Sequence, residues 1–525
     1  MDADVIIAGA GPSGLMLAGE LCLAGVRPLV LERQPRPGAT PKASAFSGQI
    51  LELLRYRGLL DRVEAAGNGP IRPAPQAPFG GIHLDFSSLA DPPLWVAPLP
   101  QARLERLLGE HALELGADIR RGHEVETVSA GDATVTADVR GPDGPYRMTA
   151  RYLVGCDGAH SRVRETAGIP FPGTTYPEVN RMGTVAVHES VTLLDDGGFD
   201  VAGAGVVPFG YTHTERGTIA VAAHRPGAML VYTVEEDPSV ASGSASGADS
   251  DSPLTMDELA ASVRRVLGFD LPMGEPSRLT RFAYQARQAE RYRCGRLLLA
   301  GDAAHLFPAG GQGIGVGVMD AVNLAWKLAG VLEGRAPAGL LDTYHSERHP
   351  AGARALMQCR AQVAMRRGND AEAFALRDLF GELLADEPAL RRVAALIAGS
   401  DVRYPMPGAD VGAGAGQHAL AGTFAPDLSL DTGEGTTSVA ELMRAARPVL
   451  LDLADRADIR AAAGHWEGRV TVVTAAADVT AGQRPADAVL IRPDAYIAWA
   501  AAVDEPGDSA APALRDALTY WFGAP

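Results

Sequence analysis

Cysteine is scarce in this sequence, and the few positions that it occupies exclude several kinds of site. The 525 residues include four cysteines, which lie far apart: Cys22, Cys156, Cys294 and Cys359. None of them has CxxC or metal-ligand spacing, so neither a redox pair nor a metal site is expected. We therefore expect reduced thiols and a cytoplasmic location.

Signals for membranes and nucleic acids are also missing. No apolar run reaches the ~20 residues of a membrane span, and residues 1–20 lack the basic segment of a signal peptide. A net charge of −17 argues against nucleic acid or an anionic membrane as a partner. What remains is a globular composition, 46% hydrophobic and 21% charged. Its length allows about three domains of ~150 residues.

The first 33 residues predict a bound dinucleotide. An apolar run leads into Gly9, Gly11 and Gly14, then a helical pattern, then a second apolar run that ends in Glu32. Gly9 permits the tight turn, Gly11 lets the backbone approach a pyrophosphate, and Gly14 lets the helix pack on the strand. The helix N-terminus would attract the phosphates, and Glu32 would accept hydrogen bonds from ribose hydroxyls. An ordinary glycine-rich turn is the alternative.

Two later motifs extend this nucleotide site. Residues 151–164 (RYLVGCDGAHSRVR) predict a strand ending in Asp157, for which a plain turn with an aspartate cap is the alternative. Residues 296–328 predict a strand ending before Asp302, a loop (Pro308–Gly315) almost free of side chains, and a helix from about Gly317. Asp302 would suit a ribitol hydroxyl, and a flat ring could lie on the loop. The helix dipole would stabilise negative charge on a reduced isoalloxazine.

Hydrophobic patterns outline the rest of the chain. The sequence predicts helices at 49–65, 101–115, 255–267 and within 318–398, strands within 123–140 and 181–235, a low-complexity mobile loop at 238–253, and a glycine-rich linker at 405–416. The strands within 181–235 are a candidate wall of a substrate chamber. The segment after the linker has an αβ pattern of its own.

In this order and spacing, the three motifs resemble the group A flavin monooxygenases, which have the fold of p-hydroxybenzoate hydroxylase. The resemblance covers essentially the full chain and is closest to bacterial aromatic polyketide hydroxylases of the angucycline and anthracycline types. Stretches such as GGIHLDFSSL, ELGADIRRGHEV and LLDTYHSERHP are similar to that group. The resemblance implies an α/β fold. Its parts would be a Rossmann-like FAD-binding domain (1–70, 98–175 and 281–400), a β-sheet substrate domain (71–97 and 176–280) and a structural, thioredoxin-like C-terminal domain (416–525).

The resemblance also implies which residues contact FAD. They are Gly9, Gly11, Ser13, Gly14, Glu32, Arg33, Lys42, Gln101, Val125, Asp157, Asp302, Pro308, Gly311, Gly313, Ile314 and Gly315. Lys42 stands where the family usually has arginine, and Gly315 stands where it usually has asparagine. The backbone of Pro308, next to the reactive flavin C4a edge, is the catalytic candidate.

The activity implied is an NAD(P)H- and O2-dependent monooxygenation of a polycyclic aromatic polyketide, through a flavin C4a-hydroperoxide. NADPH or NADH would bind transiently, because only one dinucleotide motif is present. His83, Tyr211 and His213 could polarise a substrate phenol, although packing or surface roles are the alternative. No segment singles out the buried arginine that a small carboxylated phenol would need, so we expect a large, flat aromatic substrate. The protein would be a monomer or a homodimer.

Several rival functions are weighed against this one. A flavin disulfide reductase would need a second nucleotide motif and a close cysteine pair, and both are missing. A flavin halogenase would show a WxWxIP-like stretch, whereas the five tryptophans lie far apart. Baeyer–Villiger or ring-rearranging oxygenation stays open, and so does a non-catalytic flavoprotein that sequesters a ligand.

Overall fold

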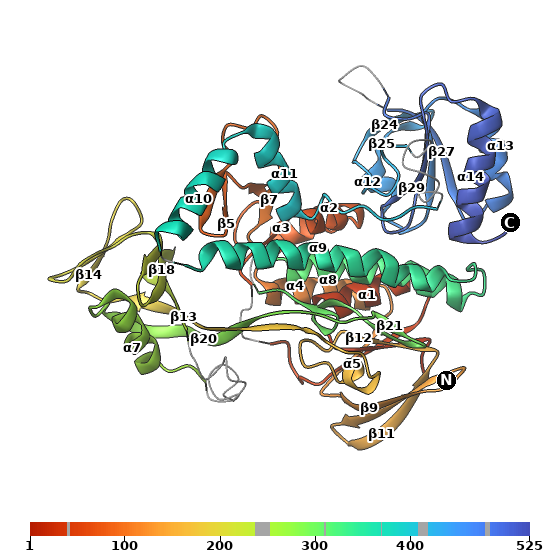
Figure 1. Cartoon of the computed structure of the whole chain (residues 1–525). Coiled ribbons are helices and arrows are strands. Elements are labelled where there is room, and N and C mark those ends of the chain that lie inside the picture. Colours follow the sequence, from red (N-terminus) through yellow and green to blue (C-terminus); the bar gives the residue numbers. More distant parts are fainter. Residues whose placement is uncertain (39–42, 237–252, 309–310, 369, 408–417, 478–483) are drawn as a thin grey trace.

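The computed structural model describes residues 1–38, 43–236, 253–308, 311–368, 370–407, 418–477 and 484–525. Two six-stranded sheets form the body of the molecule, and a third lies in a separate C-terminal unit (Figure 1). Lys42 lies outside the described residues. So do nearly all of the predicted low-complexity loop and most of the predicted linker. The α/β fold class expected from the sequence is confirmed.

The first sheet carries the N-terminal motif. Its strands are ordered β21 (Arg293–Cys294), β22 (Leu297–Leu299), β12 (Tyr152–Gly155), β1 (Val5–Ala8), β2 (Pro28–Glu32) and β8 (Asp118–Arg121). All neighbours pair in parallel except β21 with β22. Strands β1, β12 and β22 are fully buried, as continuous apolar runs in a parallel sheet usually are. The carboxyl ends of these strands therefore meet at one edge, where Gly9, Asp157 and Asp302 follow.

Helices and a small sheet enclose this first sheet. Helix α1 (Pro12–Leu23) packs against α4 (Gln101–Glu114) and α8 (Gly313–Leu332). An antiparallel sheet of β9 (Glu124–Ala130), β10 (Val135–Gly141) and β11 (Gly144–Ala150) lies on the other side, below β12 in Figure 1. The strand patterns predicted within 123–140 are confirmed by β9 and β10.

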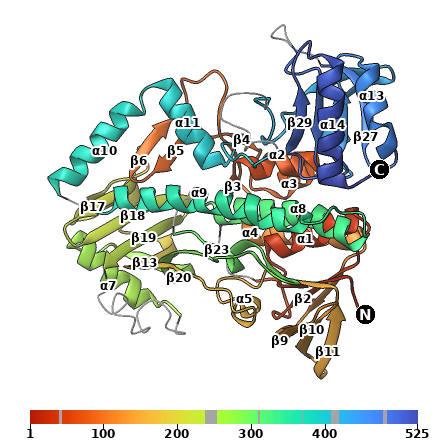
Figure 2. The same ribbon diagram turned by 45° about the vertical axis from the view of Figure 1, so that its right-hand side comes forward.

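The second sheet is antiparallel, as predicted for residues 181–235. Its strands are ordered β17 (Gly210–Thr214), β18 (Gly217–Arg225), β19 (Ala228–Glu236), β13 (Gly173–Val187), β20 (Met273–Gln288) and β23 (His305–Leu306). Helix α7 (Met256–Leu267) packs on one side, and α9 (Thr343–Arg366) crosses the other, as Figure 2 shows. Because β23 pairs with the end of β20, this sheet is joined directly to the segment that follows Asp302.

The C-terminal unit has its own mixed sheet. Its strands are ordered β25 (Gly435–Ser438), β24 (Ser429–Thr432), β27 (Thr471–Ala477), β26 (Val449–Asp452), β28 (Ala488–Ile491) and β29 (Ile497–Ala501). Only β26 and β27 pair in parallel. Helices α12 (Val439–Leu442), α13 (Ala457–Ala463) and α14 (Gly507–Phe522) accompany it. The αβ pattern predicted for this segment is confirmed.

The remaining elements are short or peripheral. They are β3 (Phe46–Ser47), α2 (Gln49–Tyr56), α3 (Leu60–Ala66), β4 (Arg72–Pro73), β5 (Gln76–Phe79), β6 (Ile82–Asp85), β7 (Trp95–Ala97), α5 (Arg162–Thr166), β14 (Val191–Leu193), β15 (Phe199–Val201), β16 (Gly205–Val207), α10 (Ala371–Leu383) and α11 (Glu387–Ala398), with 3-10 turns at Gly301–Ala303, Leu340–Asp342 and Gly464–Trp466. The hairpin β5–β6 shares a hydrophobic core with α10 and α11.

Two helix predictions need correction. Residues 49–65 form two helices, because Gly58 takes a left-handed backbone (φ +66°) between α2 and α3. The helix predicted from about Gly317 begins at Gly313, so three glycines stand in its first turns. The first-turn amides of α8 therefore belong to the glycine-rich segment itself.

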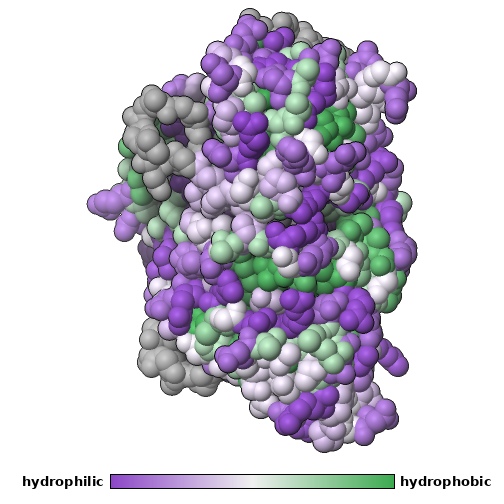
Figure 3. All heavy atoms as spheres, turned by 90° about the vertical axis from the view of Figure 1, so that its right-hand side faces the viewer, coloured by the Kyte–Doolittle hydropathy of each residue, from purple (hydrophilic) through white to green (hydrophobic). Residues whose placement is uncertain are grey.

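Helix α8 is the core helix of the body. By length and composition it could cross a membrane, but 72% of its apolar window is buried inside the fold. Its packing against α1 and α9 explains that composition without a membrane. The face seen in Figure 3 is mostly hydrophilic, with a band of hydrophobic side chains across its middle.

Candidate active site

The turn between β1 and α1 is shaped by its three glycines. A Cβ at Gly9 (φ +104°) would collide with the carbonyl of Cys156, and one at Gly14 would collide with the carbonyl of Gly9. At Gly11, by contrast, no described residue lies within 4 Å of an added Cβ. It is the N-cap of α1 and caps no amide through a side chain, so the first amides of the helix stay available. This is the arrangement in which a helix N-terminus binds phosphate.

An open cleft of about 2050 Å³ extends from this turn along the edge of the first sheet. Eight residues predicted to contact FAD line it: Gly9, Gly11, Glu32, Arg33, Gln101, Val125, Asp157 and Asp302. Ser13 and Gly14 lie beneath it, where Ser13 packs against Gly301 and Gly317. The structure thus brings three distant motifs to one groove.

Backbone amides hold the carboxylate of Glu32 at the mouth of the cleft. Its Oε2 accepts from the amide of Ala10, and its Oε1 accepts from the amide of Gln34, both at 2.8 Å. A carboxylate oxygen has more than one lone pair, so each oxygen of Glu32 can still accept a hydrogen bond from a ligand hydroxyl. The side chain is therefore held in place before any ligand arrives.

Asp157 brings an acceptor without a protein partner into the cleft. Its Oδ2 accepts from the amide of Val163 at 3.2 Å, whereas its Oδ1 is buried and has no hydrogen-bond partner in the described structure. Buried polar atoms are nearly always paired, so a ligand donor is the simplest partner for this oxygen. A hydroxyl of a sugar or ribitol chain meets that need.

We call residues 301–308 and 311–317 the glycine-rich loop. Among the residues that the structure describes, an added Cβ at Gly311 or Gly315 would meet nothing within 4 Å, so backbone is not covered by them there. Asp302 stands at one end of the loop, and its Oδ1 would lie 3.7 Å from a Cβ at Gly313. The loop therefore offers amides rather than side chains beside a carboxylate.

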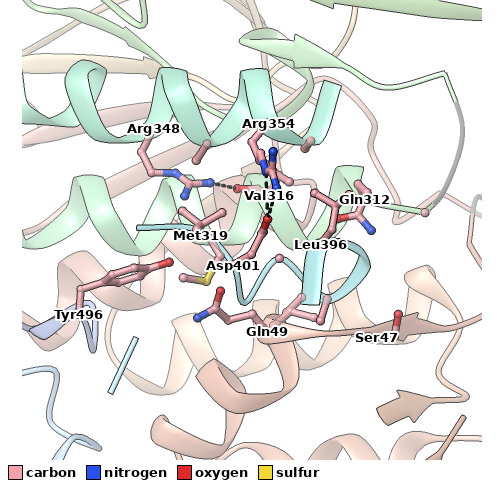
Figure 4. Close-up of a pocket in the computed structure, with 18 residues that line it drawn as sticks. Ser47, Gln49, Gln312, Val316, Met319, Arg348, Arg354, Leu396, Asp401 and Tyr496 are labelled. Atoms are coloured by element: carbon pink, nitrogen blue, oxygen red, sulfur yellow. Dashed lines mark hydrogen bonds and ion pairs between the residues drawn. The ribbon is translucent and has the colours of Figure 1, made fainter. Parts of the chain in front are cut away.

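A second pocket, with about 580 Å³ of empty space, adjoins the start of α8 (Figure 4). Figure 4 shows Gln312 and Leu396 on one side of it and Tyr496 on the other. The Nε2 atom of Gln312 donates to the carbonyl of Ile397 at 2.7 Å, and Arg354 pairs with Asp401 at 2.8 Å. The end of α11 thus covers the glycine-rich loop on this side.

These features fit FAD as a ligand. The cleft offers a helix N-terminus for a pyrophosphate, and the carboxylates of Glu32, Asp157 and Asp302 for hydroxyls. The first turn of α8 offers backbone amides at Gly313, Ile314 and Gly315 for the edge of a flat ring. Pro308 is described, but Ala309 and Gly310, which follow it, lie outside the described residues.

A cluster of tyrosines lies on the second sheet. The Tyr232 hydroxyl donates to Asn180 Oδ1 and lies 3.1 Å from the Tyr284 hydroxyl. The Tyr211 ring meets the Tyr232 ring edge-on, with 6.4 Å between centroids. The guanidinium of Arg366, at the end of α9, lies 5.1 Å from the centre of the Tyr284 ring. We call these five side chains the tyrosine cluster.

Burial and neighbouring charges shift the pKa values of side chains in and beside the cluster. Although Tyr211 is 42% exposed, the partial burial of its phenol raises the phenol pKa. Burial lowers the pKa of His213, with Arg377 and Arg366 acting in the same direction. Although burial lowers it, the neighbouring phenols raise the pKa of Arg366. His213 is therefore biased towards its neutral form, while Arg366 stays charged.

Two buried donors without a hydrogen-bond partner in the described structure lie on the helices that carry Arg366 and Arg377. One face of α9 carries three polar residues spaced four positions apart, Gln358, Gln362 and Arg366. The Nε2 atom of Gln358 and an Nη2 atom of Arg377 are buried without a hydrogen-bond partner in the described structure. A site with spare donors suits a ligand that carries carbonyl or phenolic oxygens.

The cluster partly corrects the sequence-based site. Tyr211 belongs to the cluster and His213 lies on the same strand as Tyr211, whereas His83 lies exposed on β6, in a different sheet. The sequence singled out no arginine for this site, and the structure places Arg366 and the buried Arg377 at it. Sequence reasoning missed Tyr232, Tyr284 and Arg366, because only the pairing of the strands and the packing of α9 on the sheet bring them together.

The chain is similar to known proteins over its whole length. The family described as FAD binding domain matches residues 2–359, and the family described as aromatic-ring hydroxylase, C-terminal, matches residues 418–525. A solved aromatic hydroxylase from angucycline biosynthesis, CabE, superposes with a TM-score of 0.86 at 39% identity, covering 100% of this chain and 99% of that one.

Two curated relatives have different names. The 12-dehydrotetracycline 5-monooxygenase/anhydrotetracycline 6-monooxygenase of Streptomyces rimosus subsp. rimosus is 42% identical over 535 residues, and both chains are covered completely. The dialkyldecalin synthase of Streptomyces rugosporus is 38% identical over 524 residues, covering 100% of this chain and 99% of its own. Proteins of this likeness thus include a monooxygenase and a synthase.

Proposed function

Because this chain belongs to the family of FAD-binding aromatic-ring hydroxylases, as its motifs predicted, we propose that it uses NAD(P)H and O2 to oxygenate a polycyclic aromatic polyketide. It is a flavin monooxygenase by family. The observation that carries the substrate proposal is that one strand pair joins the FAD side of the molecule to the tyrosine cluster. The glycine-rich loop lines the cofactor side, and its strand β23 pairs with β20, which bears Tyr284 of the tyrosine cluster.

Each part of the cleft takes one part of FAD in this proposal. The N-terminus of α1 binds the pyrophosphate, Glu32 accepts from the ribose, and Asp302 accepts from the ribitol chain. The amides of Gly313–Gly315 meet the ring, where the dipole of α8 favours negative charge. Bound FAD would supply the redox chemistry, taking a hydride from NAD(P)H and activating O2.

The substrate is proposed to lie between the glycine-rich loop and the tyrosine cluster. Arg366 would donate to its carbonyl or phenolic oxygens, and the spare donor of Arg377 would meet another. The Tyr284 hydroxyl, whose proton goes to Tyr232, would accept from a substrate hydroxyl. A nearby guanidinium lowers the pKa of a phenol, and a phenolate is the more electron-rich ring for oxygen transfer. The protein's share is thus to orient the ring, to exclude water and to favour the deprotonated form.

A second candidate function is cyclisation without oxygen transfer. It is favoured by one observation, the full-length similarity to a dialkyldecalin synthase. The two candidates differ in their stoichiometry, because a cyclase consumes neither NAD(P)H nor O2. Baeyer–Villiger oxygenation, by contrast, shares that consumption and differs in where the oxygen enters the product.

Anaerobic reduction tests the proposal. The purified protein should be yellow, with one FAD per chain, and NADPH should bleach it faster when a four-ring aromatic phenol is present. A matched measurement with NADH identifies the preferred reductant. A protein that retains no flavin would contradict the cofactor site. A flavin that NAD(P)H never bleaches, with or without the phenol, would favour the cyclase or a sequestering role.

A further inference from the structure

Six charged side chains are buried together where α8 and α9 meet the C-terminal unit. They are Asp320 and Lys327 of α8, Glu347 and Arg348 of α9, and Arg492 and Asp494 of the turn between β28 and β29, and none is more than 2% exposed. Three cations face three anions, so the group is neutral as a whole. Buried ion pairs repay their desolvation only when their geometry is good. None of the six lines the FAD cleft.

Glu347 is the centre of the half that faces the C-terminal unit. Both terminal nitrogens of Arg492 donate to its two oxygens, at 2.7 and 2.8 Å, and Lys327 Nζ donates at 2.7 Å. The Nδ2 atom of Asn323 bridges Glu347 and Asp494, at 2.7 and 2.9 Å. Burial raises the pKa of Glu347, but Arg492 and Lys327 outweigh it and lower that pKa to about 2.

Asp320 and Arg348 form the half that faces the glycine-rich loop. Arg348 Nε donates to Asp320 Oδ1 at 2.7 Å, while Asp320 Oδ2 accepts from the Gly301 amide at 3.1 Å and pairs with His305 Nε2 at 2.7 Å. Arg348 Nη2 donates to the carbonyl of Val316 at 3.1 Å, as the dashed line in Figure 4 shows. One ion pair therefore holds both ends of the loop.

The two halves are linked twice. Glu347 and Arg348 are neighbours on α9, so the pair with Arg492 fixes the turn of helix that carries Arg348. In addition, Arg348 Nη1 donates to the Tyr404 hydroxyl at 2.9 Å, and the Tyr404 ring stacks on Tyr496 with 3.8 Å between centroids. Tyr496 belongs to the same turn as Arg492. Contacts thus continue from the C-terminal unit to the loop.

We propose that the C-terminal unit holds the glycine-rich loop in its ligand-binding conformation, with Asp320 and Arg348 as positioning residues. Gly301 and Gly311 have left-handed backbones, φ +63° and +68°, and glycine loses more conformational freedom than any other residue when it is ordered. If other parts of the protein already order the loop, the entropy cost of ordering it does not reduce the affinity for the ligand. Only the identification of the ligand as FAD rests on the proposed function.

Two conservative variants of the full-length protein test this role. Arg492→Lys keeps the charge but loses the two-pronged bond to Glu347. Tyr404→Phe removes one of the three acceptors of Arg348, together with the hydroxyl contact between Tyr404 and Tyr496. Tyr56→Phe is the matched control, because its buried hydroxyl bonds the C-terminal unit at Ala425 (2.7 Å), at a point outside this network. If Arg492→Lys fails to fold, Tyr404→Phe still tests the proposal.

The first readout is amide hydrogen exchange in protein free of ligand, and the second is FAD affinity. In both network variants, peptides covering 301–308 and 311–320 should exchange about tenfold faster, and FAD should bind about tenfold more weakly. The control should match the wild type in both readouts. Equal effects of Tyr56→Phe and Tyr404→Phe would overturn the proposal. So would faster exchange with unchanged FAD affinity.

The two proposals fail separately. If the wild type binds no FAD, the proposed function is wrong. Faster exchange confined to the loop in the network variants would still support the proposal that the C-terminal unit holds the loop, which we call the bracing. If FAD binds well in every variant and the loop exchanges at the wild-type rate, the bracing is wrong and the FAD site stands.

Discussion

At the scale of single residues, the cofactor proposal depends on carboxylates that follow strands. Glu32 is held by two backbone amides, and Asp157 keeps a buried oxygen without a protein partner. The glycines beside them place no side chain in the cleft. The few side chains that do enter it therefore determine which ligand groups are bound. Removing one of these acceptors should therefore weaken FAD binding.

Glu32→Ala and Asp302→Ala should each weaken FAD retention. Ribose or ribitol hydroxyls would lose their acceptors, at a cost of ~1–3 kcal/mol apiece. Equilibrium dialysis of FAD against the apoprotein measures the loss, and Asp138→Ala is the control, because Asp138 is a half-buried carboxylate on β10 that does not line the cleft. Wild-type flavin content in both cleft variants would overturn the placement of the site.

Glu347→Gln should make the free energy of unfolding less sensitive to acid. The folded pKa of Glu347 is about 2 against an ordinary value of 4.5, because Arg492 and Lys327 outweigh burial. A carboxylate with a lowered folded pKa stabilises the protein above its unfolded pKa and loses that effect as pH falls towards the folded one. Between those two values the wild type should lose on the order of 3 kcal/mol more than the variant. Urea titrations at stepped pH measure this, and parallel curves would contradict it.

At the scale of elements, hydrophobic pattern predicted strands better than helix ends. The strands β9 and β10 were predicted from alternation, and those within 181–235 were predicted from short β-like runs separated by glycines. The helix predicted over 49–65 was wrong, although Gly58, a residue typical of a helix C-terminus, marked the break. Tertiary packing of α8 overrode the low helix propensity of Gly313, Gly315 and Gly317.

The cofactor-side residues could be proposed from the sequence, because short motifs place glycines and acids at strand ends. The tyrosine cluster could not. Tyr232 and Tyr284 meet only through the registers of β13 with β19 and with β20, and Arg366 reaches them from α9. Register over such separations depends on the assembled sheet, which no local pattern encodes.

Removing single groups of the tyrosine cluster should affect the substrate and spare the cofactor. Tyr284→Phe and Arg366→Met should each raise the KM for a polycyclic phenol by about tenfold, because a charged or phenolic hydrogen bond is lost. FAD affinity should not change. Arg281→Met is the control, since Arg281 lies on the same strand but pairs with Glu258 of α7. Steady-state kinetics on flavin-saturated protein measure the effect, and an unchanged KM in both variants would exclude the cluster from the substrate site.

At the scale of the whole molecule, the proposed cofactor site, substrate site and loop-holding network occupy different parts of one chain. The first sheet supports the cleft, the second supports the tyrosine cluster, and the C-terminal unit meets both helices that flank the glycine-rich loop. The C-terminal unit carries no cysteine, so a positioning role suits it better than redox chemistry. The division into the three predicted domains stays a prediction.

Cys294→Ser and Cys359→Ser should leave turnover largely unaltered. Neither side chain lines the cleft or the pocket at the start of α8. Cys359 is fully buried on α9, so its variant should unfold at a somewhat lower temperature without losing activity per folded molecule. Activity normalised to flavin content is the measurement. A collapse of turnover in folded protein would reveal thiol chemistry.

Product mass after reaction with isotope-labelled O2 is the measurement that tests the central claim most directly. The holoprotein is incubated with NADPH and a four-ring aromatic phenol, with p-hydroxybenzoate in a parallel reaction. We predict that the four-ring product gains one labelled oxygen atom for each NADPH consumed, and that p-hydroxybenzoate gains none. A product of unchanged mass formed without NADPH consumption would contradict the monooxygenase function and favour cyclisation. Coupled oxygenation of p-hydroxybenzoate would contradict the assignment of a polycyclic substrate.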